Sequence, residues 1–219
     1  MLPQQWGVMG WSSALESGVT VAAARSLVLG LLVAAVATPL GAMAGRALGW
    51  REVRRPQATA AILLAPVVLP PFAVSMGLDV VILRVGVPDL MAVLLVLSVF
   101  ALPYTTYTMR AAYRGIDEGL EEQARMLGAS PRQARRRATL PAVRAGLLVS
   151  AGLAFLVGWS DYVVTLLVGG GQLVTVPILL GSTAAGTGRE ATVAVLSLVT
   201  VAPPMLVLLV ARAWKGVRS

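Results

Sequence analysis

Residues 26–45 read SLVLGLLVAAVATPLGAMAG, which is a run of twenty positions without a charged side chain. A helix that crosses the hydrocarbon core of a bilayer needs about 20 mostly apolar residues, so this stretch is long enough to span a membrane. Further uncharged stretches follow at residues 56–78, 90–109, 145–160 and 191–211. The sequence therefore predicts an all-α, polytopic membrane helix bundle. We expect five spanning helices at residues 23–45, 57–83, 88–112, 142–168 and 190–212.

The composition agrees with a membrane protein and excludes several other classes. Of the 219 residues, 57% are hydrophobic and 13% are charged, whereas about a quarter of the residues of a soluble domain are charged. The chain has no cysteine and no histidine. Disulfide scaffolds, thiolate metal sites, cysteine nucleophiles and any Ser–His pair are therefore excluded.

The positive charges predict the orientation of the bundle. The chain has 18 Lys and Arg against 10 Asp and Glu, and fifteen of the 18 lie in residues 46–56, in residues 110–144 or from Arg212 to the end of the chain. Loops rich in Lys and Arg stay in the cytoplasm, so the C-terminus is expected inside and the N-terminus outside. The charge excess then reports orientation in an inner or plasma membrane, and no nucleic-acid partner is needed to explain it.

The expected parts of the chain follow from this topology. Residues 1–22 form an extracytoplasmic segment, residues 23–213 the transmembrane domain, and residues 214–219 a cytoplasmic tail. Residues 1–22 lack the basic region of a signal peptide, because the first positive charge is Arg25. Trp6 and Trp11 favour a position of this segment at the membrane interface. The alternative is that residues 1–22 form a disordered tail.

Two places inside the spans are candidates for the substrate pathway. Pro66, Pro70 and Pro71 cluster in the second span and predict a structured break. In the fourth span the candidates are Trp159, Asp161 and Tyr162, and Asp161 is the only acidic residue of that span. A carboxylate inside a membrane is costly and is by default a functional candidate, and the alternative is a carboxylate in water at the outer boundary.

Small residues predict close helix packing in the first span. Gly41 and Gly45 form a G-x-x-x-G pattern, which allows two helix backbones to approach each other. The pattern favours a compact bundle and pairing with another membrane subunit.

The cytoplasmic loop at residues 115–141 predicts two short helices with a sharp turn between them. Asp117 is the expected N-cap of the first helix, and Gly128 is its expected stop. Ser130, Pro131 and Gln133 form a capping box that starts the second helix, which we expect to end at Leu140 before the next span begins at Pro141.

One face of the first loop helix is apolar. Ile116, Leu120, Ala124 and Leu127 follow each other at helical spacing. An apolar face that projects into the cytoplasm predicts a docking surface for another protein. The alternative is a helix that lies on the lipid bilayer, with the arginines of residues 132–137 near anionic headgroups.

This loop resembles the EAA loop of binding-protein-dependent ABC importer permeases, also called the MetI-like family. The pattern of that family is E-A-A-x-x-x-G, nine residues, then I-x-L-P. Here Glu122-Gln123-Ala124-x-x-x-Gly128 and Ala138-Thr139-Leu140-Pro141 stand at that spacing. Gln123 replaces the usual Ala and Ala138 the usual Ile. The resemblance covers roughly residues 20–212, through weaker fragments such as Leu69-Pro70-Pro71 and Gly158-Trp159-Ser160-Asp161-Tyr162.

The resemblance implies a function and a set of partners. Such permeases form the membrane pathway of an importer, pair as homo- or heterodimers, and receive substrate from an extracytoplasmic binding protein. Their EAA helix couples to a separate ATP-binding cassette subunit that uses the ATP. The implied coupling residues are Glu121, Glu122, Ala124, Leu127, Gly128, Ala129, Ser130, Leu140 and Pro141.

The chain itself has no G-x-x-x-x-G-K-[ST] motif, so no P-loop cofactor site is expected in it. Relatives in the polyamine, thiamine and iron branch carry a further N-terminal helix. The resemblance therefore implies a minimal five-span core or a start upstream of Met1.

The resemblance around residues 159–162 and 174–177 is greatest to spermidine/putrescine permeases, and Asp161 would suit a cationic polyamine. Iron, thiamine, molybdate and sugar permeases share the scaffold, so these substrates remain alternatives. Two other classes compete with a permease. An intramembrane enzyme would have only Asp161 and hydroxyl groups for catalysis, and a passive scaffold or anchor would leave the loop spacing unexplained.

Overall fold

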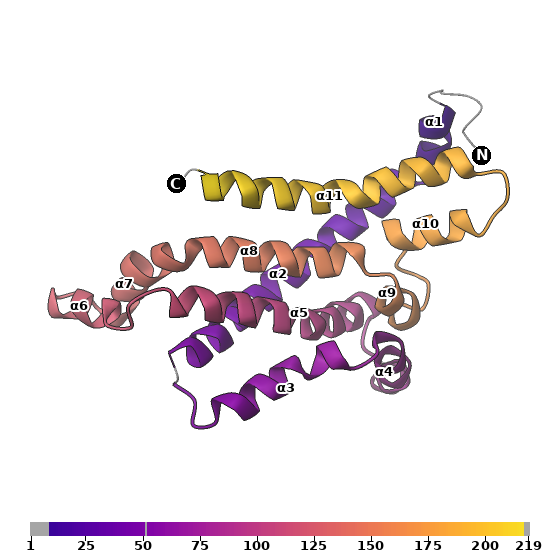
Figure 1. The fold of residues 1–219 in the computed structure, drawn as a ribbon. Coiled ribbons are helices and arrows are strands. Elements are labelled where there is room, and N and C mark those ends of the chain that lie inside the picture. The colour runs from indigo at the N-terminus through magenta and orange to yellow at the C-terminus, as the bar shows by residue number, and fades with distance from the viewer. Residues whose placement is uncertain (1–8, 51, 217–219) are drawn as a thin grey trace. The chain divides into compact units, whose positions relative to one another are not determined.

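The computed structural model of the protein describes residues 9–50 and 52–216, and within that part of the chain all regular elements are helices (Figure 1). The all-α prediction is therefore confirmed. The elements are α1 Met9–Glu16, α2 Val19–Gly49, α3 Pro56–Val68, α4 Pro71–Val85, α5 Asp89–Arg114, α6 Leu120–Met126, α7 Pro131–Ala134, the π-helix η1 Arg135–Thr139, α8 Leu140–Ser160, α9 Val163–Val168, α10 Val176–Ala184 and α11 Glu190–Gly216.

Four or five of these segments could cross a membrane. Four helical segments in the described residues are long and apolar enough on their own, and α3 with α4 makes a fifth if the interrupted pair counts as one span. The four are Val19–Gly49, Asp89–Arg114, Pro131–Ser160 and Glu190–Leu209. This agrees with the expected multi-pass bundle.

Two expected spans have different limits. The second span is broken between α3 and α4, as the proline cluster predicted, and Leu69 before the break has the extended backbone that a following proline favours (φ −77°, ψ 132°). The fourth span was expected to continue to residue 168, but α8 ends at Ser160 and a separate helix α9 begins at Val163. At this break the Asp161 carboxylate, one residue before the N-cap Tyr162, accepts hydrogen bonds from Thr165 in the first turn of α9.

The ends of the chain are more helical than expected. Residues 9–16 form α1, and α2 already begins at Val19, so the predicted extracytoplasmic segment 1–22 includes helical residues. Trp11 is half exposed, at 50%. Trp6 and residues 217–219 of the expected tail lie outside the described residues, whereas α11 extends through residue 216.

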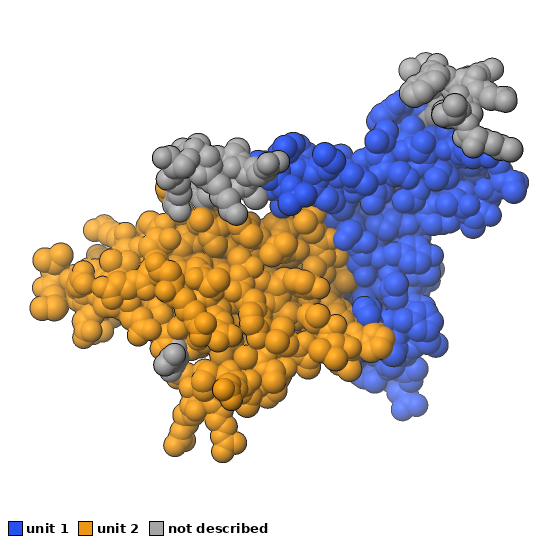
Figure 2. Space-filling model, in the orientation of Figure 1, with its two compact units in different colours: residues 1–31, 71–96, 158–219 blue, residues 32–70, 97–157 orange. Residues whose placement is uncertain are grey.

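The chain divides into two compact units, which Figure 2 colours separately. The first comprises residues 1–31, 71–96 and 158–219. In it, α1 and α10 pack on α11, and Ala14, Val19, Val195 and Leu196 form a buried cluster. The amide of Val176 at the start of α10 donates a 2.9 Å hydrogen bond to Ser26 Oγ in α2. These contacts fix the first turns of α2 against the α10–α11 region.

The second unit comprises residues 32–70 and 97–157. In it, the later turns of α2 lie directly against α5, because glycines line the contact. A Cβ atom added at Gly45 would stand 2.7 Å from the backbone N of Arg110. The predicted close packing at the G-x-x-x-G pattern is thus confirmed, and this face is taken up inside the chain.

The core of the second unit lies at the ends of α2 and α5. Trp50, Met109, Tyr113 and Val143 form a buried cluster there. Trp50 Nε1 donates a 3.1 Å hydrogen bond to the carbonyl of Tyr113, and the two rings meet edge to face at 5.2 Å. Ile116, at the start of the loop at residues 115–141, packs against this cluster.

Candidate functional site

The predicted docking loop folds as two short helical segments, α6 and α7, beyond the ends of α5 and α8 (Figure 1). The expected N-cap at Asp117 is wrong, because α6 begins at Leu120 and Gly119 occupies the cap position. The Asp117 carboxylate instead accepts a 2.9 Å hydrogen bond from the Gly119 amide and closes a turn before the helix. Aspartate commonly closes a turn of this kind two residues ahead, in competition with capping a helix.

The turn between α6 and α7 has the predicted chemistry. Gly128 has a left-handed backbone (φ +87°), and its amide donates to the carbonyl of Arg125 at 2.9 Å. The amide of Ala129 donates to the carbonyl of Ala124 at 3.1 Å, which completes a Schellman motif. The expected helix stop at Gly128 is therefore confirmed.

The second segment starts with the predicted capping box. Ser130 Oγ accepts from the Gln133 amide at 3.4 Å, and Gln133 Oε1 accepts from the Ser130 amide at 2.9 Å. With Pro131 at the first helical position, the start of α7 is fixed within one residue of the end of the Schellman turn. The loop thus has a defined shape without any partner.

The outer side of this turn is exposed and partly apolar. Met126 is 83% exposed and Leu127 is 89% exposed. A groove with a volume of about 620 Å³ runs along the same turn. Its lining residues are Glu122, Arg125, Met126, Gly128, Ala129, Ser130, Pro131 and Gln133. Four of the predicted coupling residues, Glu122, Gly128, Ala129 and Ser130, therefore lie together on one surface.

The expected apolar face does not all point outward. Ile116 packs against the buried cluster of the second unit, and Leu120 and Ala124 are half-buried. Only Leu127, at the end of the stripe, is exposed. The prediction of a fully exposed stripe is wrong, because burial of the first three residues holds α6 on the bundle and leaves the exposed surface at the turn.

Glu121 points inward and is the most highly connected polar residue of the loop. Its carboxylate accepts two hydrogen bonds from Arg46, Nη1 to Oε1 at 3.0 Å and Nη2 to Oε2 at 3.1 Å. Thr139 Oγ1 donates a third, at 2.7 Å to Oε1. The Arg46 and Glu121 side chains are only 27% and 20% exposed. The sequence grouped Glu121 with the coupling residues but gave no sign of these partners.

Leu140 and Pro141 lie inside a continuous helical run and not at a helix end. The segments α7, η1 and α8 follow one another without a break from Pro131 to Ser160. At the π segment the Leu140 amide donates to the carbonyl of Arg135, five residues back. Pro141 has no amide hydrogen and would clash with the carbonyl four residues back, and a wider π turn relieves this conflict. The expected helix end at Leu140 is therefore wrong.

The candidate pathway residues Trp159, Asp161 and Tyr162 connect four helices of the first unit. Trp159 Nε1 donates to the carbonyl of Thr200 in α11 at 3.0 Å. Asp161 Oδ2 accepts from the amide and the hydroxyl of Thr165 in α9, at 2.8 and 2.9 Å. Tyr162 packs on α10, since a Cβ atom added at Gly181 would stand 2.9 Å from its ring.

Pro70 and Pro71 stand at the break between α3 and α4, and Pro71 is the first residue of α4. Helix α4 packs against α9, which follows Tyr162. The structure therefore brings the helix that begins at Pro71 close to the helix capped by Asp161. Pro70 belongs to the other unit.

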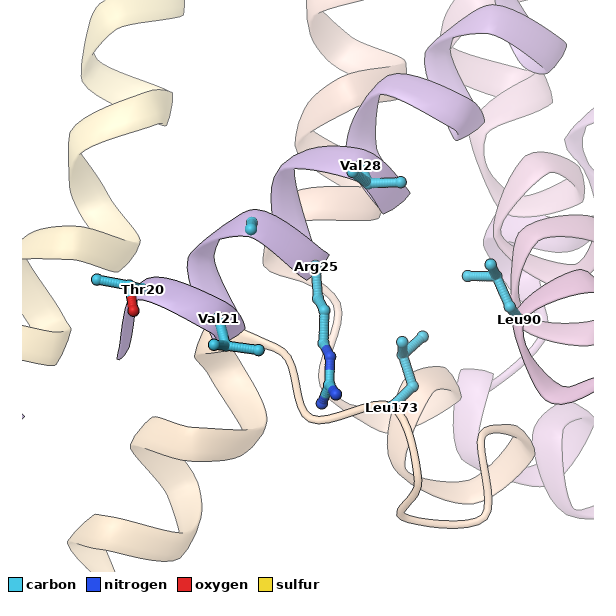
Figure 3. A pocket seen from close by; sticks show the side chains of 7 residues that line it. Thr20, Val21, Arg25, Val28, Leu90 and Leu173 are labelled. Carbon is cyan, nitrogen blue, oxygen red and sulfur yellow. The ribbon is translucent and has the colours of Figure 1, made fainter. Parts of the chain in front are cut away.

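A pocket near the start of α2 was not predicted from the sequence. It has a volume of about 430 Å³ and is lined by Thr20, Val21, Ala24, Arg25, Val28, Leu90 and Leu173. In Figure 3 the Arg25 side chain extends from α2 toward the loop that carries Leu173. The sequence does contain one indication of this pocket, because Arg25 is an isolated charge, the only charged residue between Glu16 and Arg46.

Comparison with known proteins gives one family match over most of the chain. Residues 37–215 match the sequence profile of the binding-protein-dependent transport system inner membrane component family.

Three curated proteins are similar in sequence over about two thirds to three quarters of this chain. The trehalose transport system permease protein SugB of Mycobacterium tuberculosis is 32% identical over 143 residues, which is 65% of this chain and 52% of that protein. A probable molybdenum ABC transporter permease protein of Haloferax volcanii is 30% identical over 68% of this chain and 59% of that protein. The spermidine/putrescine transport system permease protein PotC of Haemophilus influenzae is 28% identical over 74% and 63%. The chain thus spans between about half and two thirds of the length of these relatives.

A solved structure shares the fold. The crystal structure of an amino acid ABC transporter matches 96% of this chain and 100% of that chain, with a TM-score of 0.63 at 16% sequence identity. The arrangement of helices is therefore common to the two proteins.

Proposed function

The chain belongs to the family of binding-protein-dependent transport system inner membrane components, and from this premise we propose that it is the permease subunit of an ATP-driven importer. It is a multi-pass inner membrane protein. In this proposal it forms the substrate pathway and pairs with a second permease subunit, either a copy of itself or a homologue. A separate ATP-binding cassette subunit hydrolyses the ATP, an extracytoplasmic binding protein delivers the substrate, and this chain catalyses no reaction itself.

The observation that carries the proposal is the shaped turn at residues 126–131. Exposed Met126 and Leu127 stand beside a groove whose backbone is fixed by a Schellman motif and a capping box. Burial of an exposed leucine in a partner stabilises a complex by about 1.5–3 kcal/mol. A rigid turn with two exposed apolar side chains therefore suits the docking of an ATPase subunit, and the positive charges of the same loop support a cytoplasmic location for it.

For the substrate, a polyamine is the most specific proposal, and it is supported by the spermidine/putrescine relative and by the resemblance around residues 159–162. A sugar and molybdate are supported by the other two relatives. The geometry of Asp161 does not favour the cation, because one carboxylate oxygen already caps α9. Binding of spermidine, trehalose and molybdate to the binding protein encoded beside this chain distinguishes the three.

The docking role is tested by purifying tagged permease from its native host and measuring the ATP-binding cassette subunit that co-purifies with it. Leu127→Asp should reduce the bound ATPase by roughly tenfold to a hundredfold, because it removes a buried apolar contact of about 1.5–3 kcal/mol and adds a charge. Arg137→Gln is the matched control: it makes the same change in net charge at an exposed position of η1, outside the residues that line the groove. If both variants retain the ATPase, the docking role of Leu127 is wrong; if the wild type itself binds none, the proposed function is wrong.

A further inference from the structure

The two neighbouring glutamates of α6 face different environments. Glu122 is exposed and lines the groove at the turn. Glu121 is largely buried and binds Arg46 and Thr139. Adjacent residues on a helix point about 100° apart, so one side chain can face a partner while the next faces the bundle. The pair therefore separates two tasks, contact with the ATPase and connection to the membrane helices.

Arg46 is itself held in place at the end of α2. Its Nε lies 3.3 Å from Glu52 Oε1, and its guanidinium stacks over the Trp50 ring at 4.6 Å. Trp50 in turn donates to the carbonyl of Tyr113 at the end of α5. These contacts connect Glu121, through one guanidinium, to the ends of both α2 and α5.

Thr139 provides a second connection, from Glu121 to α8. It is fully buried and is the last residue of η1, which continues directly into α8. Its hydroxyl donates the shortest of the three hydrogen bonds to Glu121. A π segment is a local distortion of an α-helix that often marks a functional site, so a connection at this point acts on a helix that can change its turn locally.

We infer that Glu121 is the positioning residue through which a movement of the docking helix α6 reaches α2, α5 and α8. In the described residues, the side-chain hydrogen bonds from α6 to other helices all come from this one carboxylate. The bidentate Arg46 pair fixes direction as well as distance, which a packing contact does not. The inference rests on the proposed function, and it predicts a loss of coupling without a loss of ATPase binding.

The test uses the complete transporter, with ATPase and binding protein, reconstituted in proteoliposomes. Two quantities are measured for each variant: the ATPase bound per permease, and the substrate transported per ATP hydrolysed. In Glu121→Gln the bound ATPase should stay at the wild-type level, while transport per ATP falls by roughly tenfold, the size expected when a charge-assisted hydrogen bond is lost. Glu122→Gln is the matched control. Its bound ATPase should fall, while the complexes that do assemble should transport as much substrate per ATP hydrolysed as the wild type.

A double-mutant cycle keeps the inference testable if one variant folds poorly. Arg46→Gln combined with Glu121→Gln should lower the ratio no further than either single change, because both remove the same interaction. Thr139→Val keeps the ion pair and the shape of the side chain but removes the hydroxyl donor, so it should reduce the ratio by a smaller factor.

Three results would overturn the inference: a wild-type ratio in Glu121→Gln, a loss of bound ATPase equal to that of Glu122→Gln, or additive effects in the cycle. Failure of the proposed function looks different, because then the wild-type permease itself binds no ATPase.

Discussion

Gly128 is the residue at which backbone geometry should translate most directly into ATPase affinity. Its φ of +87° is a conformation that side-chain-bearing L-residues rarely adopt, and nothing lies within 4 Å of the position that a Cβ atom would take. The methyl group of Gly128→Ala therefore contacts no neighbour, and the free-energy cost of the substitution comes entirely from the left-handed backbone. For an L-residue in the left-handed region this cost is about 1–2 kcal/mol. The same amount changes an equilibrium by a factor of about 5–30.

In Gly128→Ala we expect the affinity of the ATPase subunit to fall by up to about this factor, because the free variant can relieve the strain by leaving the left-handed turn and must regain that conformation on binding. Gly128→Asn should fall between the wild type and Gly128→Ala, since asparagine tolerates the left-handed conformation better than alanine does. The affinities can be measured by titrating the ATPase subunit into permease held in lipid nanodiscs.

Gly119→Ala is the control for the added methyl group in the same loop. Gly119 has a right-handed backbone (φ −70°), which alanine adopts without strain. It should bind the ATPase as the wild type does. Equal affinities for wild type and Gly128→Ala, or an equal loss in Gly119→Ala, would refute the account of the turn.

Two further predictions concern the bundle. Gly45→Ala should destabilise the protein by about 1–3 kcal/mol, because the new methyl group meets the backbone N of Arg110 at 2.7 Å. Gly77→Ala has open space in a helix and should instead stabilise the protein by about 0.5–1 kcal/mol. Thermal unfolding in detergent compares the two variants, and a Gly45→Ala protein as stable as the wild type would contradict the close packing of α2 on α5. Asp161→Ala should cost about 0.5–2 kcal/mol through loss of the cap on Thr165, and Asp161→Asn should keep both an acceptor and transport. Abolished transport in a stable Asp161→Asn would instead identify Asp161 as a substrate contact.

Features that depend on a few neighbouring residues could be predicted from the sequence. The Gly128 stop and the Ser130 capping box are complete within residues 124–133, so the residue types that form them can be recognised from the local sequence. The uncharged stretches likewise predict spanning helices, because the requirement is one of length and polarity alone.

Features that depend on tertiary contacts could not be predicted. Glu121 binds Arg46, which is 75 residues away in the chain, and Thr139, which is 18 residues away. Nothing local to Glu121 distinguishes it from Glu122. The apolar stripe of α6 was similarly ambiguous, because periodicity reports that a face is apolar but not whether it packs on its own bundle or on a partner.

The end of α8 shows a different reason for a wrong expectation. Asp161 was weighed as an isolated carboxylate in an apolar span, whereas Thr165, four residues later, supplies two donors for it. The pair ends one helix and starts the next, so the uncharged stretch 145–160 coincides closely with the real end of the helix at Ser160.

The Schellman motif at Gly128 and the capping box at Ser130 together affect the entropy that the loop loses when it binds a partner. A segment that orders only on binding loses backbone entropy of about 1–2 kcal/mol per residue at the moment of association. Here the backbone from Ala124 to Gln133 is already fixed by its own hydrogen bonds when the permease folds. If the proposed function holds, binding of the ATPase subunit needs little rearrangement of this segment, and the two proteins can separate and reassemble without unfolding it.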